Sequence, residues 1–453
     1  MRTNTKTTST LKTHEGAPAK WIDPKAQLER LISCCLLWED QFYVDGQEIS
    51  DSIENALNEY LSQFTLGSSK RGNGADTGPS ALEQSILLAI KAREQLHLRH
   101  LPLYMMALIA ARSSRDRRIK FGIARVIQRA DELGEFLSLW AKVTGRHPKN
   151  LTRLQGQVKK GLAMAFQKFD GYQLAKYNRK ADITLTDVAR LVHPKHTDAI
   201  GGLIAGTLPT PDTWEVNLSA GGDKKETFER LLREGKLGYL ALLRNLRNMV
   251  EADVDHSLVE AALRQGKGSH RVLPFRYVAA ARAAPSFANA IQDALMAKLG
   301  MMPEFDGKTL ILVDVSGSME VGLSRQSDMT RMHAAAALAS LWLGQRRVFT
   351  FSNNVQEVAC YPGLPGVDAI INSQFHSGTY LGRAIEQMND IEADRLVVVS
   401  DEQSHDHVPE PVHEKAYMIN IASYRNGVGY GRWTHIDGWS ENVFRFMHAV
   451  EQG

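Results

Sequence analysis

The chain has 453 residues, which is too many for one hydrophobic core and predicts two or three domains. Its 43% hydrophobic and 23% charged residues are typical of a soluble globular protein. We expect no membrane-spanning segment, since no apolar run is long enough, and no signal peptide, since the first 12 residues are polar and Thr-rich. The three cysteines form no plausible disulfide framework, so we expect a reducing, cytoplasmic location.

Charge is divided unevenly along the chain. Residues 301–453 contain 11 of the 54 Lys and Arg residues and 19 of the 51 Asp and Glu residues, which leaves 43 and 32 for residues 1–300. The first part therefore carries a net charge of +11 and the last part −8, from the same counts. This division predicts a polyanionic partner for the first part alone.

The first 300 residues are predicted to be almost entirely helical. Residues 1–20 are expected to be a disordered tail, Asp23-Pro24 is typical of a helix start, and the Gly- and Ser-rich stretch 66–79 is expected to be a flexible insertion. Apolar periodicity then predicts helices at 81–96, 102–112, 117–130, 132–144, 151–169, 172–176, 185–192, 199–206, 213–220, 224–234, 237–251, 256–263 and 274–299. Helices in succession with short turns indicate an α-solenoid over residues 21–300.

The pattern changes at Gly307 to alternating strands and helices. Strands are predicted at 309–313, 347–351, 356–359, 395–400 and 416–421 and near His435, and helices at 329–344, 382–388 and 441–450. This alternation predicts a doubly wound, Rossmann-like α/β domain with a mainly parallel sheet over residues 305–453.

Three loops of this domain carry oxygen donors at strand ends. Asp314, Ser316 and Ser318 follow the first strand, Thr379 precedes a helix, and Asp401 follows another buried strand. Because loops at the carboxyl ends of parallel strands meet at one edge, these oxygens can converge on a hard divalent cation, most plausibly Mg²⁺. Each residue could also be an ordinary loop or helix-capping residue.

The same residues favour binding over catalysis. Neutral hydroxyls leave the cation much of its charge, so an open position can take a carboxylate or phosphate oxygen from a partner, such as an acidic protein. Ser400, Asp401, His405 and His407 bring serine, acid and histidine together, but neighbours on one loop rarely form a catalytic triad. We therefore predict no enzymatic activity.

The set of oxygen donors formed by Asp314, Ser316, Ser318, Thr379 and Asp401 resembles the metal-ion-dependent adhesion site of von Willebrand factor A domains.

Two basic runs lie in the helical part. The longer run contains the single acid Asp170 and the basic residues Lys142, Arg146, Lys149, Arg153, Lys159, Lys160, Lys168, Lys176, Arg179 and Lys180. The other run contains Arg112, Arg115, Arg117, Arg118, Lys120, Arg125 and Arg129, with Asp116 as the only acid. Such runs can neutralise RNA phosphates, and Tyr172 and Tyr177 could stack on unpaired bases. The alternative is a solvated helix face.

Several stretches together resemble the TROVE module of the Ro 60-kDa autoantigen family. They are His14-Glu-Gly16 before the Asp-Pro helix, Phe42-Tyr-Val44, 185–195, 237–249 with Leu-Leu-Arg-Asn-Leu at 242–246, and Arg271-Val-Leu-Pro274-Phe275. The A-type domain follows in the same order, so the resemblance covers roughly residues 12–453.

This resemblance implies a ring of HEAT-like repeats that binds small non-coding Y RNAs outside and the single-stranded ends of misfolded RNAs in its hole. It also implies a role in RNA quality control with an exoribonuclease such as polynucleotide phosphorylase. The family's RNA-contact region maps onto the helix with Lys159 and Lys160 and onto the segment that ends in His193-Pro-Lys195. His193 could instead be a helix-end residue that satisfies a carbonyl.

At one position the chain departs from the family, because 184–187 read Thr-Leu-Thr-Asp where relatives often have a histidine.

Two other functions stay open. One is a Mg²⁺-dependent protein-interaction scaffold, and the other is an RNA-processing enzyme, for which no convincing catalytic constellation is present.

Overall fold

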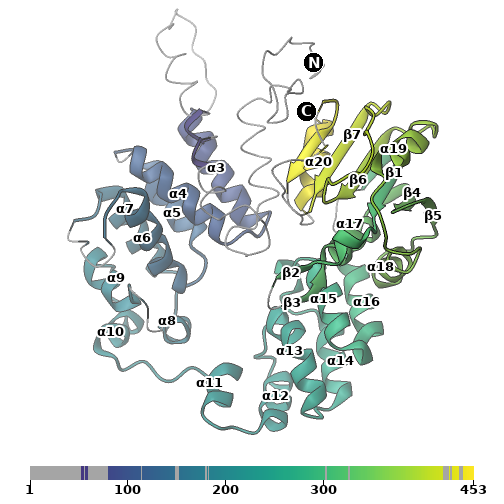
Figure 1. The fold of residues 1–453 in the computed structure, drawn as a ribbon. Helices are drawn as coiled ribbons and strands as arrows, with labels where there is room; N and C mark the ends of the chain where they lie inside the picture. Colours follow the sequence, from purple (N-terminus) through teal and green to yellow (C-terminus); the bar gives the residue numbers. More distant parts are fainter. Residues whose placement is uncertain are drawn as a thin grey trace, which may run out of the picture. The chain divides into compact units, whose positions relative to one another are not determined.

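The computed structural model describes residues 53–55, 57–59, 80–113, 115–147, 151, 153–178, 181, 183–300, 304–324, 327–421, 428, 431–437 and 442–452. They fall into a helical unit, Asp51–Ala220, and a C-terminal unit that includes Gly221–Gly453. Each unit is described by itself below (Figure 1). The predicted tail 1–20 and insertion 66–79 lie outside the described residues, as do Lys149, Arg179 and Lys180.

The helical unit confirms the prediction of successive helices. Its helices are α3 (Ala81–Glu94), α4 (His100–Arg112), α5 (Arg118–Val126), α6 (Asp131–Val143), α7 (Gly156–Phe166), α8 (Gly171–Tyr177), α9 (Leu185–Val192), α10 (Asp198–Ala205) and α11 (Trp214–Ser219). Each packs mainly on near neighbours in the sequence, such as α3 on α4 and α5, and α5 on α7. Glycine permits a close approach of α7 to α5: a Cβ at Gly161 of α7 would lie 2.8 Å from Ile123 and 3.0 Å from the Lys120 carbonyl of α5.

Three predicted helices are shorter than expected. Residues 151–169 were predicted as one helix, but α7 spans only Gly156–Phe166, because Gln155, with ψ 141°, lies outside the helical region. Residues 117–130 were predicted as one helix, but α5 ends at Val126 and Ile127 is extended. The Lys168 ammonium donates to the carbonyls of Ala124 and Ile127, so these carbonyls are satisfied without a further helical turn. Residues 274–299 were also predicted as one helix. The structure breaks it at Pro285, which lacks an N–H group and holds Ala284 outside the helical region, with φ −144° and ψ 74°.

The C-terminal unit begins with helices and continues into the α/β domain. The helices are α12 (Lys224–Arg233), α13 (Tyr239–Glu251), α14 (His256–Gln265), α15 (Phe275–Ala283) and α16 (Ala288–Leu299), with short 3₁₀ turns at Ser269–Arg271 and Pro285–Phe287. Gln292 of α16 joins the two parts. Its amide donates to the Pro362 carbonyl and accepts from the Leu364 N–H, at 3.0 and 2.8 Å.

The predicted sheet is confirmed, with strands β1 (Phe305–Asp314), β4 (Gly344–Phe351), β5 (Val355–Val358), β6 (Arg395–Ser400), β7 (Lys415–Asn420) and β8 (Thr434–Asp437). Their order is β5-β4-β1-β6-β7-β8, and all neighbours are parallel except the edge strand β5. The helices around it are α17 (Arg331–Ser340), α18 (Leu364–Ile371), α19 (Leu381–Asn389) and α20 (Asn442–Gln452). The β2–β3 hairpin (Gly322–Ser324 and Ser327–Thr330) and α18 were not predicted, because short polar or mixed segments lack a clear period.

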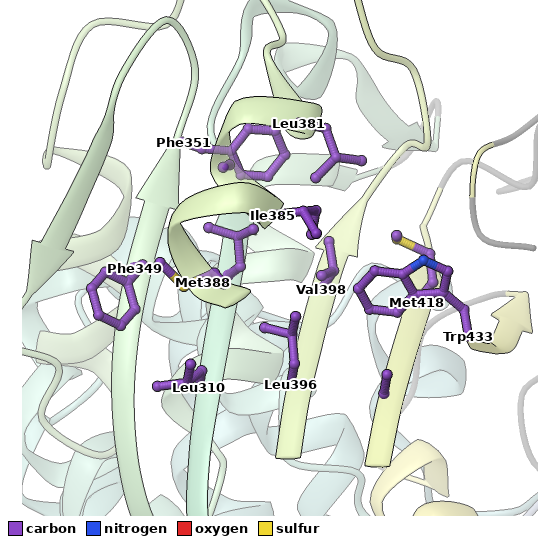
Figure 2. Packing of buried hydrophobic residues seen from close by; sticks show 13 residues of the cluster. Leu310, Phe349, Phe351, Leu381, Ile385, Met388, Leu396, Val398, Met418 and Trp433 are labelled. Atoms are coloured by element: carbon purple, nitrogen blue, oxygen red, sulfur yellow. The ribbon is translucent and has the colours of Figure 1, made fainter. Parts of the chain in front are cut away.

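Alternate strand residues bury both faces of the sheet. On one face Leu310, Leu396 and Val398 pack against α19 (Figure 2). The helix presents a single apolar ridge to them, formed by Leu381, Ile385 and Met388, because residues three and four apart share one helix face. The result is a rigid frame that fixes the loops at the carboxyl ends of β1 and β6.

Candidate metal centre and nucleic-acid interface

The loop after β1 is held by its own hydrogen bonds. The Ser316 N–H donates to Asp314 Oδ1 at 2.9 Å, the Ser400 hydroxyl donates to Asp314 Oδ2 at 2.7 Å, and the hydroxyls of Ser316 and Ser318 lie 3.2 Å apart. Asp314, Ser316 and Ser400 are buried. The carboxylate is therefore fixed at the strand end, with two hydroxyls beside it.

The other two predicted loops lie against this one. The Gly317 N–H donates to the Ser377 carbonyl at 3.0 Å, which joins the first loop to the segment that carries Thr379. The Thr379 carbonyl in turn accepts from the His405 N–H at 2.9 Å, which joins that segment to the loop after β6. The structure therefore brings the three predicted segments together, and both Thr379 and Asp401 are buried.

The charges at this site fit a hard cation. Burial, followed by the nearby charge of Asp401, raises the pKa of Asp314 to about 7. Two buried carboxylates beside hydroxyl oxygens are the donor chemistry that Mg²⁺ accepts, and the cation would relieve their repulsion. Asp314, Ser316, Ser318, Thr379 and Asp401 would hold it. Among the described residues no cluster of three or more His, Cys, Asp and Glu side chains offers another metal site.

Arg331 was not predicted at this site. Its guanidinium is buried at the start of α17, and Nη1 lies 3.5 Å from Asp401 Oδ2 and 3.4 Å from the Ser318 carbonyl oxygen. The guanidinium is positively charged, so it partly balances the charge of Asp401 and would repel a metal cation bound at this site. No motif in the sequence marks it, because the residue lies 70 positions from its partner.

We expect Arg331→Met to raise Mg²⁺ affinity about tenfold. The variant removes a positive charge a few ångströms from the cation, and the lost repulsion corresponds to about 1.4 kcal/mol of binding free energy. Calorimetric Mg²⁺ titration of the full chain measures this. Arg383→Met is the control, since its guanidinium is exposed and stacks 5.0 Å from the Tyr380 ring centre. Equal affinities for the Arg331 variant and the wild type would contradict this role.

The serine and histidine residues near the site do not form a nucleophile–base pair in the described part of the chain. The Ser400 hydroxyl donates to Asp314, and the Ser404 hydroxyl donates to Asp406 at 2.7 Å. His405 Nδ1 lies 3.0 Å from the Thr379 carbonyl oxygen, whereas Glu402 pairs with His435 at 2.5 Å. In these contacts the Ser400 and Ser404 hydroxyls donate to carboxylates rather than to a histidine.

On the helical unit, the strongest RNA candidates are lysines on α7. Lys160 is exposed and Lys159 is half-buried, and neither makes an ion pair with any residue the structure describes. They precede Gly161, where α7 crosses α5. The exposed Arg153 lies just before this helix, and its carbonyl accepts from Arg146, at 2.7 Å.

Other basic residues of the longer run make contacts within the protein. The Arg146 guanidinium lies 5.0 Å from the Trp140 ring centre, and the Lys176 ammonium lies 5.7 Å from that of Tyr177. Lys142 is exposed. The Lys168 ammonium caps the carbonyls at the end of α5, and burial lowers its pKa, so we leave Lys168 out of the RNA surface.

Acids from neighbouring helices neutralise much of the second run. Ion pairs join Arg112 to Glu54, Arg118 to Asp116 and Glu83, Arg125 to Glu94, and Arg129 to Asp131. Arg117 and Lys120 make no ion pair within the described residues. The second run therefore has only one acid within its own sequence, but on the folded surface acids from other segments neutralise several of its arginines.

The segment after α9 lies beside the end of α7. Gln167 donates to the Lys195 carbonyl at 2.9 Å, and both His193 and Lys195 are exposed. His193 has φ 49° and caps α9 through its backbone N–H, so it occupies a helix end while its ring stays exposed. At the departure from the family, Thr184 and Asp187 form a capping box for α9.

Comparison with known proteins identifies part of the chain. Residues 204–294 match the family model of the TROVE domain. Over these residues the chain is similar to TROVE domains. This match confirms the predicted resemblance, and it includes the stretch 242–246. Within the TROVE segment Leu242, Asn245 and Leu246 are buried, and the Asn245 amide donates to the Ala241 carbonyl at 2.8 Å, so the most recognisable TROVE stretch is mainly a packing element.

A solved structure extends the likeness over nearly the whole chain. The crystal structure of the Deinococcus radiodurans RO (RSR) protein aligns with 94% of this chain and 100% of its own, with a TM-score of 0.62 and 16% identity. This confirms the predicted fold: a helical-repeat part followed by an α/β domain.

Curated relatives match over short stretches. Telomerase protein component 1 of Mus musculus is 33% identical over 110 residues, which are 23% of this chain and 4% of that protein. The Rattus norvegicus protein is 37% identical over 76 residues, 16% and 3% of the two chains. The chain thus spans only a few per cent of these relatives' length. Among the described helices, none has the length and apolar character needed to cross a bilayer.

Proposed function

We propose that this chain is an RNA-binding protein of the Ro/TROVE type. The observation that carries the proposal is the group of cations on the helical unit that lack ion pairs within the described residues, in a chain with the fold of the RO protein. The group includes Arg117, Lys120, Arg153, Lys159, Lys160 and Lys195. Cations of this kind supply phosphate contacts with little base discrimination.

The RNA we propose is a small, structured, Y-like non-coding RNA together with the single-stranded ends of structured or misfolded RNAs. In this role the protein would act in RNA quality control in the cytoplasm and hand RNA to a partner exoribonuclease, such as polynucleotide phosphorylase. It would not itself cleave RNA, which is in keeping with the structural contacts of Ser400, Ser404 and His405.

Purification from the native cell followed by sequencing of the bound RNA tests this proposal. We expect enrichment of one or a few small structured RNAs over total cellular RNA. A mock purification from cells lacking the protein is the control. Recovery of no RNA above the mock level, with the protein intact, would contradict the proposal.

A second candidate function is a Mg²⁺-dependent contact with an acidic protein through the α/β domain. Its support is the joined set of loops that carry Asp314, Thr379 and Asp401. A pull-down in Mg²⁺ and in EDTA distinguishes it: a protein partner retained only in Mg²⁺, with no RNA in the purified sample, favours the scaffold over the RNA-binding function.

Asp314→Ala separates the two functions. We expect this variant to lose the rise in melting temperature that Mg²⁺ gives the wild type, because one of two carboxylate ligands is gone, while RNA affinity changes less than twofold. Differential scanning fluorimetry and a filter-binding assay measure the two effects. If RNA affinity fell with Mg²⁺ response, the two functions would share one site and the proposed division would be wrong.

A further inference from the structure

An exposed apolar pair lies on the helical unit between two ion pairs. Leu87 of α3 is 50% exposed and Phe121 of α5 is 51% exposed. Glu83 of α3 pairs with Arg118 of α5 at 2.8 Å, and Glu94 pairs with Arg125 further along both helices. Leu87 follows Glu83 by four residues and Phe121 precedes Arg125 by four, so each apolar residue shares a helix ridge with the charges on either side. We call Leu87 and Phe121 the apolar pair.

The two ion pairs fix this arrangement. They join α3 to α5 at both ends of the apolar pair, and Gly122, next to Phe121, lets α5 approach the side chains of Ile86 and Met106. A Cβ at Gly122 would lie 2.9 Å from Ile86 and 2.7 Å from Met106. The ring of Phe121 is therefore held outward by a packed backbone.

Cations without acidic partners surround the pair. The Lys120 ammonium lies 4.7 Å from the Phe121 ring centre. Arg117 lies one helical turn before Phe121, and Lys91 lies one turn after Leu87; both are exposed. None of the three makes an ion pair within the described part of the chain. The surface is thus an aromatic ring with a local excess of positive charge.

We propose that Phe121 is a stacking site for one unpaired base of single-stranded RNA, with Lys120 and Arg117 contacting the flanking phosphates. This inference rests on the proposed RNA-binding function and deepens it. An aromatic face among cations is the combination that binds unpaired nucleic acid, since every base offers a π-face and every nucleotide brings a negative phosphate. A protein partner is disfavoured, because it would have to supply acids for the three cations while the apolar pair offers it only two side chains to contact.

The helix that carries Phe121 packs against α7, which carries Lys159 and Lys160. The Lys120 carbonyl marks the point where Gly161 crosses α5, and Lys160 precedes that glycine. In the proposed complex one strand of RNA contacts Lys160 and Lys120 as well as Phe121. The base stack adds affinity for unpaired RNA, which phosphate contacts alone do not distinguish from a duplex.

The test compares the full-length wild type with Phe121→Ala, Phe121→Trp and Phe121→Leu. The probes are a fluorescein-labelled uridine 12-mer and an abasic 12-mer of equal charge. We expect Phe121→Ala and Phe121→Leu to weaken binding of the uridine probe about tenfold and Phe121→Trp to retain it, because stacking needs an aromatic ring. The abasic probe should bind all four proteins equally. Phe375→Ala is the matched control, since Phe375 is 93% exposed on the C-terminal unit.

The outcomes separate this inference from the function on which it rests. If Phe121→Ala binds both probes as the wild type does, and binding still falls with salt, the stacking site is wrong and RNA binding stands. If the wild type binds neither probe at low salt, RNA binding itself fails. Equal weakening by Phe121→Ala and Phe375→Ala would also overturn the assignment of a specific site.

Discussion

The double substitution Lys159→Glu and Lys160→Glu is expected to weaken RNA binding about 100-fold at moderate salt. Both side chains lack ion pairs within the described residues, so they are available for phosphates. Charge reversal removes two attractive contacts and adds two repulsive ones, and the salt dependence of binding should become shallower by about two contacts. Fluorescence anisotropy with a structured small RNA measures the affinity and its salt slope together.

Lys224 and Lys225 provide the matched control. They are adjacent, exposed lysines at the start of α12 of the C-terminal unit, and Lys225 pairs with Asp253 at 3.2 Å. Reversing both should change RNA affinity less than threefold. An equal loss in the two double variants would show that net charge alone determines binding, and the assignment of the RNA surface to the helical unit would be wrong.

Arg395→Met is expected to lower the free energy of unfolding of the C-terminal unit by about 3–5 kcal/mol, as for other buried pairs that lose one partner. Arg395 is fully buried at the start of β6. It donates from Nε to Glu451 of α20 at 2.6 Å and from Nη1 to the Thr309 hydroxyl at 2.7 Å. The variant leaves the buried Glu451 carboxylate without its main partner.

Glu451 shows why this pair matters at neutral pH. Burial opposes its charge, but hydrogen bonds from Arg395, Lys415 and Tyr417 hold its pKa below the ordinary value. Its contribution to stability is therefore present at neutral pH and lost as the pH falls through the carboxyl range. Urea unfolding followed by tryptophan fluorescence measures the loss.

Arg347→Met is the control for this loss of stability. Arg347 makes an equivalent two-bond pair with Glu357, at 2.8 Å for each bond, but both side chains are 49% exposed. Water screens such a pair, so we expect a change below about 1 kcal/mol. If the two arginine variants unfold at the same urea concentration, burial does not set the strength of these pairs.

The α/β domain could be predicted closely from the sequence. The strands 309–313 and 395–400 contain the continuous apolar runs 310–313 and 396–399, because they are buried on both faces of a parallel sheet, and that pattern has few alternatives. The segments that carry Asp314, Thr379 and Asp401 could be predicted to meet for the same reason, since parallel strands end at one edge. The binding of Mg²⁺ by these residues stays a prediction.

Contacts between distant residues could not be predicted. Arg331 reaches Asp401 only because α17 begins beside the loop after β6, and no local pattern encodes that neighbour. The second basic run has one acid in the sequence, yet Glu83 and Glu94 from α3 pair with its arginines. Counting charges along one segment therefore overestimates a surface to which adjacent helices contribute.

The stretch 242–246 shows that an easily recognised sequence need not lie on the functional surface. It is the most recognisable part of the sequence, but its leucines and Asn245 are buried within α13. Recognition of the fold thus came from residues that pack, whereas the residues proposed to bind RNA lie on surfaces where many sequences are tolerated.

The dependence of RNA affinity on salt tests the central claim most directly. The full-length protein is titrated against its co-purified RNA at 50, 100, 200 and 300 mM potassium chloride, a range over which the Debye length shortens and screening increases. Several phosphate contacts predict a linear fall of log affinity with log salt, amounting to at least about 100-fold across the series. The same affinity at the lowest and highest salt would contradict the account, because the proposed cations would then carry none of the binding.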